Sequence, residues 1–223
     1  MYKRQDGDRL LRRLPGGETR LVDVVYRRTD DDHVRDEHGE LTEIARMVLE
    51  PWLGGQIGLV NAFGNGLADD KLIHGHVEDF VRFYLDEEPL VRSVPTHEVT
   101  AADGRLSIAD LRKLVVKPRD GYGGAGVVIG AHAETNDLER VAGELEARPE
   151  DFITQPIVAL SRHPTVIEGR LEPRHVDLRP FAFCDGVDVA LIPGGLTRVA
   201  LDAGALVVNS SQHGGGKDTW VVD

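Results

Sequence analysis

Hydrophobic and polar residues follow regular patterns in the first part of the chain, and these patterns predict short strands and helices. Arg20–Arg27 (RLVDVVYR) alternates and is rich in β-branched residues, which predicts a strand. Thr42–Leu53 carries apolar residues at helical spacing, and we expect Pro51 to shorten this helix. Ile57–Asn61 is predicted to be a short buried strand, and Asp69–Tyr84 a helix with one apolar face.

The composition changes at Pro89–Thr96, which we interpret as an extended linker with a subdomain boundary near it. The pattern after this linker predicts a second set of alternating elements. They are a short helix at Ile108–Leu114, strands at Leu114–Lys117, Val127–Ile129 and Ile153–Ile157, and a helix at Thr135–Ala147 with Thr135 as its N-cap.

From Pro173 to Asp223 the chain is β-rich, with apolar alternating stretches divided by glycine turns. Strands and helices therefore alternate first, and strands dominate afterwards. This order predicts a mixed α/β fold of the α+β type and argues against a doubly wound parallel sheet.

Composition and charge narrow the class of protein. The 223 residues are 41% hydrophobic, which is enough to bury a sizeable core. A disulfide scaffold is excluded because Cys184 is the only cysteine, and we expect it to pack as a small hydrophobe. The net charge of −12 argues against a nucleic-acid partner. No apolar run approaches the ~18 residues of a membrane span, and Met1–Leu14 is too charged for a signal-peptide core.

The first residues, MYKRQ, resemble the translation of a transposon-end sequencing adapter. We therefore expect residues 1–5 to be foreign to the protein and its natural chain to begin further upstream. A plain basic N-terminus is the alternative interpretation.

The segment Val115–Val127 (VVKPRDGYGGAGV) combines a lysine at a strand end with a glycine-rich turn and a second strand. Its glycines are Gly121, Gly123, Gly124 and Gly126. Glycines let backbone N–H groups approach phosphate oxygens, and Lys117 would add a positive charge. It is not a Walker A loop, because the required Gly-Lys-Ser/Thr residues are missing, and it is not a Rossmann loop, because strands are expected on both sides where a Rossmann loop runs from a strand into a helix. A flexible hairpin without a ligand remains open.

Three further segments offer groups to a ligand. Gln155, in Asp151–Ile157, could present an amide and backbone groups to an adenine ring, although a plain edge strand explains it as well. Gly214–Gly216 followed by Lys217 predicts a second flexible, anion-binding loop, with an ordinary surface loop as the alternative. Lys71 is expected in the first turn of a helix, where a phosphate would also meet free N–H groups, but helix lysines are usually solvated.

Several of these segments, taken together and in order, resemble the circularly permuted ATP-grasp proteins, relatives of the ATP-binding domain of glutathionylspermidine synthase. The match runs from Val22 to the C-terminus. The segments are VDVVYRRTDDD, VNAFGNGLADDK, VVKPRDGYGGAG, ITQPIVALSRHP, PRHVDLRPF, PGGLTRVAL and VNSSQHGGGKDTW.

The resemblance implies an ATP-grasp fold, in which two α+β subdomains clasp ATP. It also implies a carboxylate–amine (or thiol) ligase that acts through an acyl phosphate. On this pattern we expect residues 6–95 to be a partial permuted core, residues 96–165 the nucleotide-clasping subdomain with the glycine-rich loop, and residues 166–223 the β-rich C-terminal part of the core.

The resemblance also implies roles for single residues. Lys71 and Lys117 resemble the two lysines that bind the ATP phosphates, and Asp120–Gly126 resembles the mobile phosphate cover. Gln155 lies in the segment that corresponds to the adenine hinge. Arg27, Arg179 and Arg198 are the candidate catalytic residues that would bind phosphate or a substrate carboxylate, since a guanidinium suits both groups.

The chain departs from the family at its metal ligands. The family's acidic motif precedes the position that corresponds to Val22, and no such string occurs here. Asp30–Asp32 is the nearest acidic cluster, but we do not assign it that role. His74 and His76 point about 200° apart on a helix, so we assign no metal ligand. ATP and Mg²⁺ are the implied cofactors, and we expect this chain to be a truncated, inactive fragment of a ligase.

Two other functions stay open beside the ligase. One is a nucleotide-binding module without catalysis, and the other is a β-rich interaction domain that binds no nucleotide. We expect small-molecule carboxylate and amine substrates, no nucleic-acid or membrane partner, and a cytoplasmic protein.

Overall fold

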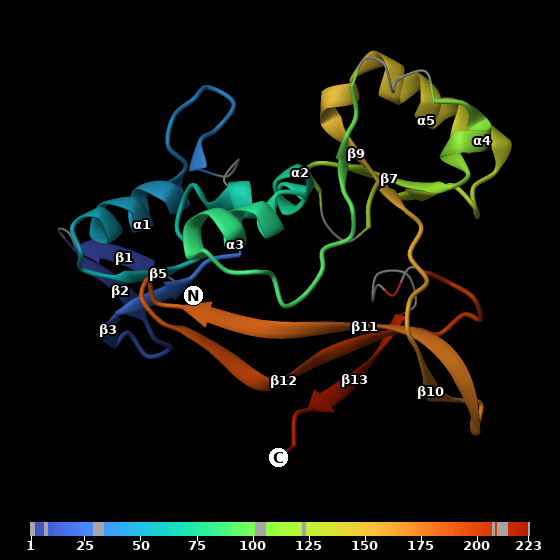
Figure 1. Ribbon diagram of the computed structural model, residues 1–223. Helices are drawn as coiled ribbons and strands as arrows, with labels where there is room; N and C mark the ends of the chain where they lie inside the picture. The colour runs from blue at the N-terminus through green and yellow to red at the C-terminus, as the bar shows by residue number, and fades with distance from the viewer. Residues whose placement is uncertain are drawn as a thin grey trace. The chain divides into compact units, whose positions relative to one another are not determined.

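The computed structural model describes residues 3–6, 9–28, 34–100, 106–121, 124–206, 208 and 214–222, and for residues 3–6 it describes the backbone. The chain divides into two compact units, Met1–His74 and Gly75–Asp223, and each is described by itself. Figure 1 labels the helices and strands of both units. Within the described ranges, no helix is long and apolar enough to cross a membrane.

The first unit contains two small sheets and one longer helix. Its elements are β1 (Lys3–Asp6), β2 (Arg9–Arg13), β3 (Thr19–Leu21), β4 (Val24–Tyr26), α1 (Glu43–Leu53), β5 (Gly58–Val60), the 3₁₀ helix η2 (Asn65–Ala68) and α2 (Lys71–His74). Strands β1, β2 and β3 form an antiparallel sheet, whereas β4 pairs in parallel with β5. Leu10 of β2, Val48 of α1 and the nearby Ile57 form the buried core of this unit.

The single strand predicted at Arg20–Arg27 is wrong, because this stretch forms two strands that belong to different sheets. Between them, the N–H of Val22 donates to the carbonyl of Leu10 at 2.9 Å, and the carbonyl of Asp23 accepts from Gly58 at 2.8 Å. The chain thus changes its pairing partner at Val22–Asp23. Alternation of side chains cannot locate such a change, because both strands keep the same two-residue period.

Helix α1 begins as predicted, but it does not stop at its proline. The hydroxyl of Thr42 accepts from the N–H of Ala45 at 3.2 Å and so caps the helix. Pro51 lies inside the helix, which continues to Leu53, so the expected shortening is wrong. The ring nitrogen of Pro51 cannot donate a helical hydrogen bond. Pro51 is buried, and tertiary packing of this kind stabilises a helix against that loss.

The helix predicted at Asp69–Tyr84 is also wrong, since it is divided into α2 and α3 (Val77–Leu85). The break falls at Gly75–His76, and glycine is among the weakest helix formers. Two residues of the expected apolar face, Phe80 and Tyr84, are exposed on α3.

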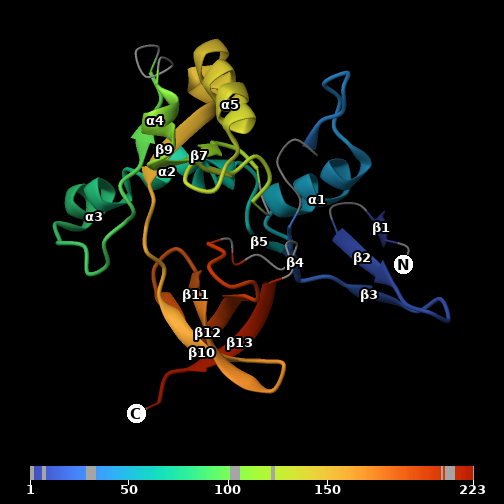
Figure 2. The ribbon, with the colours of Figure 1, turned by 90° about the vertical axis from the view of Figure 1, so that its right-hand side faces the viewer.

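The second unit contains a four-stranded antiparallel sheet with helices on one side. Besides α3, this part consists of β6 (His97–Glu98), α4 (Ile108–Leu111), β7 (Leu114–Pro118), β8 (Val128–Ile129), α5 (Thr135–Ala147), the 3₁₀ helix η4 (Pro149–Asp151) and β9 (Phe152–Pro156). The strand order is β6-β9-β7-β8. Figures 1 and 2 both show α4 and α5 on the same side of β7 and β9. The strands and helices predicted between residues 108 and 157 are confirmed to within a few residues.

Helix α5 has the predicted bounds but not the predicted cap. Its first helical residue is Thr135, and Glu134 occupies the N-cap position without a side-chain hydrogen bond to the helix. The hydroxyl of Thr135 instead accepts from a guanidinium nitrogen of Arg112 at 3.1 Å. Thr135 therefore ties α5 to the end of α4.

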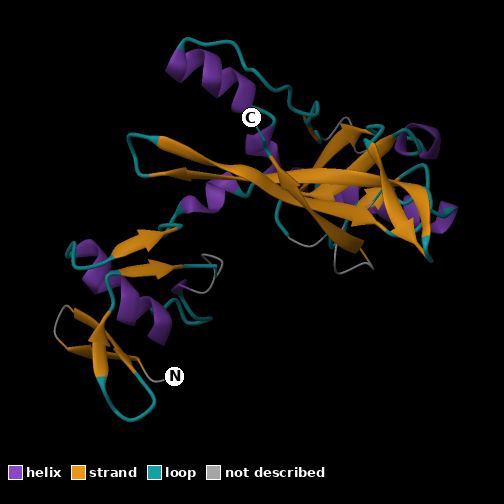
Figure 3. Ribbon diagram, turned by 90° about the horizontal axis from the view of Figure 1, so that it is seen from below, coloured by secondary structure: helices purple, strands orange, loops and turns teal. Residues whose placement is uncertain are grey.

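The C-terminal part forms a second antiparallel sheet, which confirms the predicted β-rich region and the mixed α/β order. It consists of β10 (Arg162–Ile167), β11 (Arg170–Cys184), β12 (Val189–Ala200) and β13 (Gly214–Trp220), in that order. Figure 3 shows the long, twisted β11 and β12. Cys184 is exposed near the end of β11, so the expectation that it packs as a hydrophobe is wrong.

The predicted flexible loop at Gly214–Lys217 is wrong as well, because these residues belong to β13. Lys217 lies opposite Thr197 in the pairing of β13 with β12. Its ammonium donates to the carbonyl of Pro164 and lies 3.0 Å from Nδ1 of His163, both on β10. Lys217 therefore links the two outer strands of this sheet.

Candidate functional site

The two faces of the β7–β9 pair have different surroundings. Val116 of β7 and Phe152 of β9 belong to the buried core that includes Leu138 and Leu145 of α5. Alternate residues of a strand point to opposite faces, so Lys117 and Gln155 lie on the face away from this core. Since Gln155 is opposite Val115, two residues before Lys117, the two side chains are diagonal neighbours across the pair.

Lys117 and Gln155, two of the predicted nucleotide-site residues, are in direct contact. The ammonium of Lys117 donates to Oε1 of Gln155 at 2.6 Å. At its other end, the Gln155 amide donates from Nε2 to the hydroxyl of Thr96 at 2.8 Å. Gln155 is 7% exposed, so its amide is held at both ends in a buried position. The structure thus joins the lysine of the glycine hairpin to the segment that resembles the adenine hinge.

The glycine-rich segment connects β7 to β8, as the predicted hairpin requires. Gly121, Gly124 and Gly126 have φ values of 116°, 78° and 69°, a region that other L-residues rarely adopt. At Gly126 a Cβ atom would also lie 2.7 Å from the Pro118 ring. Gly123 lies outside the described residues. The three described glycines therefore allow a backbone path that most other residues would strain.

The end of β9 is the segment with the adenine-hinge resemblance. On the edge of β9 that faces β6, pairing extends only as far as Thr154. Among the described residues, no strand pairs with this edge of β9 from Gln155 onward. The side-chain amide of Gln155 is engaged by Lys117 and Thr96. Backbone groups after Thr154, rather than this amide, are therefore the groups that could hydrogen-bond an adenine ring.

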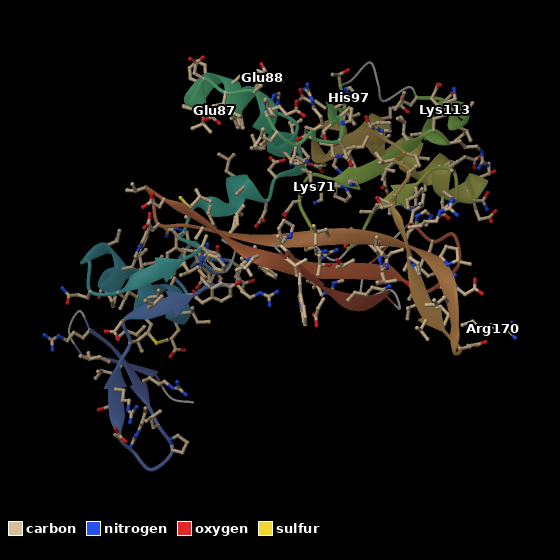
Figure 4. The ribbon with its side chains drawn as sticks, turned by 60° about the horizontal axis from the view of Figure 1, so that its bottom comes forward. Lys71, Glu87, Glu88, His97, Lys113 and Arg170 are labelled. Carbon is tan, nitrogen blue, oxygen red and sulfur yellow. The ribbon has the colours of Figure 1, made fainter. Side chains whose placement is uncertain are left out.

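Arg27 and Lys71 lie in the first unit, on either side of a loop that includes the FGNG sequence. Arg27 is buried and donates from Nε to the carbonyl of Asn61 at 2.9 Å. Its Nη2 donates to the carbonyl of Ala62 at 2.8 Å and to Oδ1 of Asn65 at 3.0 Å. These hydrogen bonds hold the loop that leads to Lys71, the half-buried first residue of α2 (Figure 4). A phosphate or carboxylate contact of Arg27 stays a prediction.

Arg179 and Arg198 share one face of the C-terminal sheet. Arg198 lies directly opposite Asp177, and Arg179 follows Asp177 by two residues on the same strand. Asp177 accepts from Nη2 of Arg179 at 3.1 Å, although it faces Arg198 in the register. Nε of Arg198 is buried and has no hydrogen-bond partner in the described part of the chain. A buried donor without a partner is rare, so Arg198 is the better placed of the two to bind an added anion.

Thr96 and the acidic residue that holds the chain before it were not predicted from the sequence as parts of the site. Thr96 is the last residue of the interpreted linker Pro89–Thr96, and no motif marked it; the acidic residue, Glu78, lies before this linker, on α3. Glu78 of α3 accepts from the N–H of Ser93 at 2.7 Å and pairs with Arg92 at 3.1 Å. The Ser93 N–H, followed by Arg92 and then Arg82, lowers the pKa of Glu78. The linker is therefore anchored to α3 immediately before it reaches Thr96.

The family resemblance implies magnesium, but the described residues form no site that fits this ion. Within the described ranges, no three His, Cys, Asp or Glu side chains form a group that could hold a metal ion. Asp30–Asp32 lies outside the described residues. We therefore place no metal and derive no step through one.

The family resemblance drawn from the sequence is confirmed by comparison with known protein families. Residues 4–200 match the circularly permuted ATP-grasp type 2 family, and the chain belongs to this family. The match includes most of each compact unit, and the predicted fold is confirmed.

Similar proteins are known in several bacteria. An uncharacterized protein of Mycobacterium tuberculosis is 45% identical over 207 residues, which are 91% of this chain and 37% of that protein. An uncharacterized Synechocystis protein is 44% identical over 204 residues, 90% of this chain and 42% of its own length. A Frankia alni protein named "Putative glutamate--cysteine ligase 2-3" is 44% identical over 211 residues, 94% of this chain and 24% of its own. The chain therefore spans less than half the length of these relatives.

Proposed function

We propose that the chain contributes the nucleotide-binding part of an ATP-dependent carboxylate–amine (or thiol) ligase. The observation that carries the proposal is the Lys117–Gln155 contact on the sheet face opposite α4 and α5, next to a hairpin in which three described glycines have positive φ. The family to which the chain belongs and the ligase name of the Frankia relative support the same reaction class.

In this proposal Lys117 binds ATP phosphates, and the loop Asp120–Gly126 covers them with its backbone N–H groups. The ammonium of Lys117 has three N–H donors, so it would donate to a phosphate oxygen while Oε1 of Gln155 continues to accept from it. Backbone groups after Thr154 would bind the adenine. Lys71 is retained as the second phosphate lysine on the strength of the family resemblance.

The proposed chemistry proceeds through an acyl phosphate. A carboxylate oxygen attacks the γ-phosphorus of ATP, and the bond to the β-phosphate oxygen breaks, so ADP leaves. The amine or thiol then attacks the acyl carbon, phosphate leaves, and the nucleophile loses its proton. Arg198, with its unpartnered Nε, is the proposed ligand for the phosphate or the substrate carboxylate, with Arg179 beside it.

The test of the nucleotide site is a comparison of two lysines that are close in sequence. Lys113 is 77% exposed on its side chain, and Figure 4 shows it beside α4, so it serves as the control for Lys117. We expect Lys117→Ala to weaken ATP binding about tenfold or more, because a hydrogen bond to a charged group contributes about 1.5–3 kcal/mol. Lys113→Ala should leave the affinity unchanged. Equal ATP affinities of the two variants in calorimetry would remove Lys117 from the site.

Catalysis is tested separately from binding. ADP release would be measured with panels of carboxylates and amines, for this chain and for the full-length Mycobacterium relative. Turnover that depends on both substrates supports the ligase. ATP binding without turnover in both proteins would favour the non-catalytic nucleotide-binding module instead.

A further inference from the structure

Thr96 lies at the end of a chain of hydrogen bonds whose direction can be assigned. Its hydroxyl has one proton, which it donates to the carbonyl of Val94 at 3.0 Å. The same oxygen must therefore act as the acceptor toward Gln155, 2.8 Å away. Only the NH₂ end of an amide can donate, so Nε2 of Gln155 faces Thr96 and Oε1 faces the other way.

The orientation of this amide decides what Lys117 meets. With Oε1 turned toward β7, Gln155 accepts from the Lys117 ammonium at 2.6 Å. With the amide reversed, an NH₂ group would face the ammonium, and two donors would oppose each other. The hydroxyl of Thr96 thus determines, through Gln155, whether the sheet offers Lys117 an acceptor or a donor.

The backbone on both sides of Thr96 is fixed. Three residues earlier, the N–H of Ser93 is held by Glu78 of α3. The next residue, His97, begins β6 and lies opposite Thr154 of β9 in the sheet; Figure 4 labels it. The Thr96 hydroxyl is therefore presented to Gln155 from a segment with two independent anchors.

We propose that Thr96 is a positioning residue that orients the Gln155 amide and thereby holds the Lys117 ammonium on the face of β7 opposite the helices. The importance of this position for ATP rests on the proposed function, in which Lys117 binds phosphate. The placement of Lys117 itself does not require a nucleotide and can be tested without one.

The test measures how fast Lys117 is acylated by trace acetic anhydride, with mass spectrometry of each lysine. The chain has five lysines, Lys3, Lys71, Lys113, Lys117 and Lys217, so the labelled peptides are few. An ammonium must lose a proton before it reacts, and its bond to Oε1 of Gln155 opposes that loss. Thr96→Val keeps the shape of the side chain but removes the hydroxyl. We expect it to accelerate acylation of Lys117 about threefold to tenfold relative to Lys113.

Two further variants separate positioning from general stability. Thr96→Ser keeps the hydroxyl and should restore the slow reaction of Lys117. Gln155→Met removes the acceptor and should accelerate Lys117 as Thr96→Val does, and the double variant should add nothing further. An unchanged Lys117 rate in folded Thr96→Val would overturn the proposal. If Thr96→Val does not fold, an unchanged rate in Gln155→Met, or fast labelling of Lys117 in Thr96→Ser, overturns it equally.

The same acylation experiment, repeated with ATP, tests the proposed function. ATP should slow acylation of Lys117 in the wild-type chain and leave Lys113 unaffected. Absence of this protection contradicts nucleotide binding at Lys117, while the nucleotide-free rates still decide the role of Thr96. The two proposals can therefore fail separately.

Discussion

Replacement of Arg27 by methionine should unfold the loop between β5 and η2. Arg27 is 8% exposed, and its guanidinium donates to two backbone carbonyls of this loop and to the side-chain oxygen of Asn65, the first residue of η2. The guanidinium carbon also lies 4.7 Å from the centre of the Phe63 ring. Methionine fills a similar volume along the stem but provides no donor, so the loop loses all these interactions together.

The size of the effect follows from these contacts. A hydrogen bond from a charged donor contributes about 1.5–3 kcal/mol, and the cation–π contact adds about 0.5–2 kcal/mol. The sum of these contributions is an upper bound on the loss of stability. Asn61 and Asn65 are exposed, so water can replace part of the hydrogen bonding that their oxygens lose. We therefore expect Arg27→Met to destabilise the first unit by about 2–4 kcal/mol. Arg27→Lys should cost less, since one ammonium can still reach one or two of the acceptors.

Amide hydrogen exchange with urea unfolding measures this effect locally and globally. The control is Arg28→Met, because Arg28 is the exposed neighbour and its replacement should change stability by less than about 0.5 kcal/mol. We expect faster exchange in Ala62–Gly66 in Arg27→Met and no change in Arg28→Met. If both variants unfold at the same urea concentration with the same exchange in this loop, the guanidinium does not hold the loop.

Two further predictions concern the second unit. A Cβ atom on Gly130 would lie 1.8 Å from the carbonyl oxygen of Leu111, so Gly130→Ala should lower the free energy of unfolding by about 1–3 kcal/mol or more. Gly143→Ala, in open space on α5, should raise it by up to about 1 kcal/mol. Equal urea midpoints of the two variants would refute the close approach at Gly130. The pKa of Glu78 lies below its ordinary value of 4.5, chiefly because the Ser93 N–H donates to the carboxylate. Its stabilising effect is therefore present above that value and lost as the pH falls through the lowered pKa, so thermal unfolding should depend less on pH below about 4.5 in Glu78→Gln than in the wild type.

The sequence by itself determined the elements whose signals are local. Helix α1 lies within the predicted Thr42–Leu53, Thr135–Ala147 forms α5, and the glycines after Lys117 form a turn between antiparallel strands. In each case the information lies within a few residues: a helical apolar period, or glycines that tolerate left-handed backbone. The family resemblance rested on such segments in order, and the family match confirms it.

Only the tertiary structure decided which distant groups meet. The split of Arg20–Arg27 between two sheets depends on partners supplied by β2 and β5. The Lys217 strand was mistaken for a loop because glycines weaken a strand pattern, although pairing with β12 still satisfies its backbone. Thr96 carries no motif and acts because β6 places it beside Gln155, 59 residues along the chain. Hydrogen bonds of that range depend on how the chain folds back, and no local pattern of residue types encodes them.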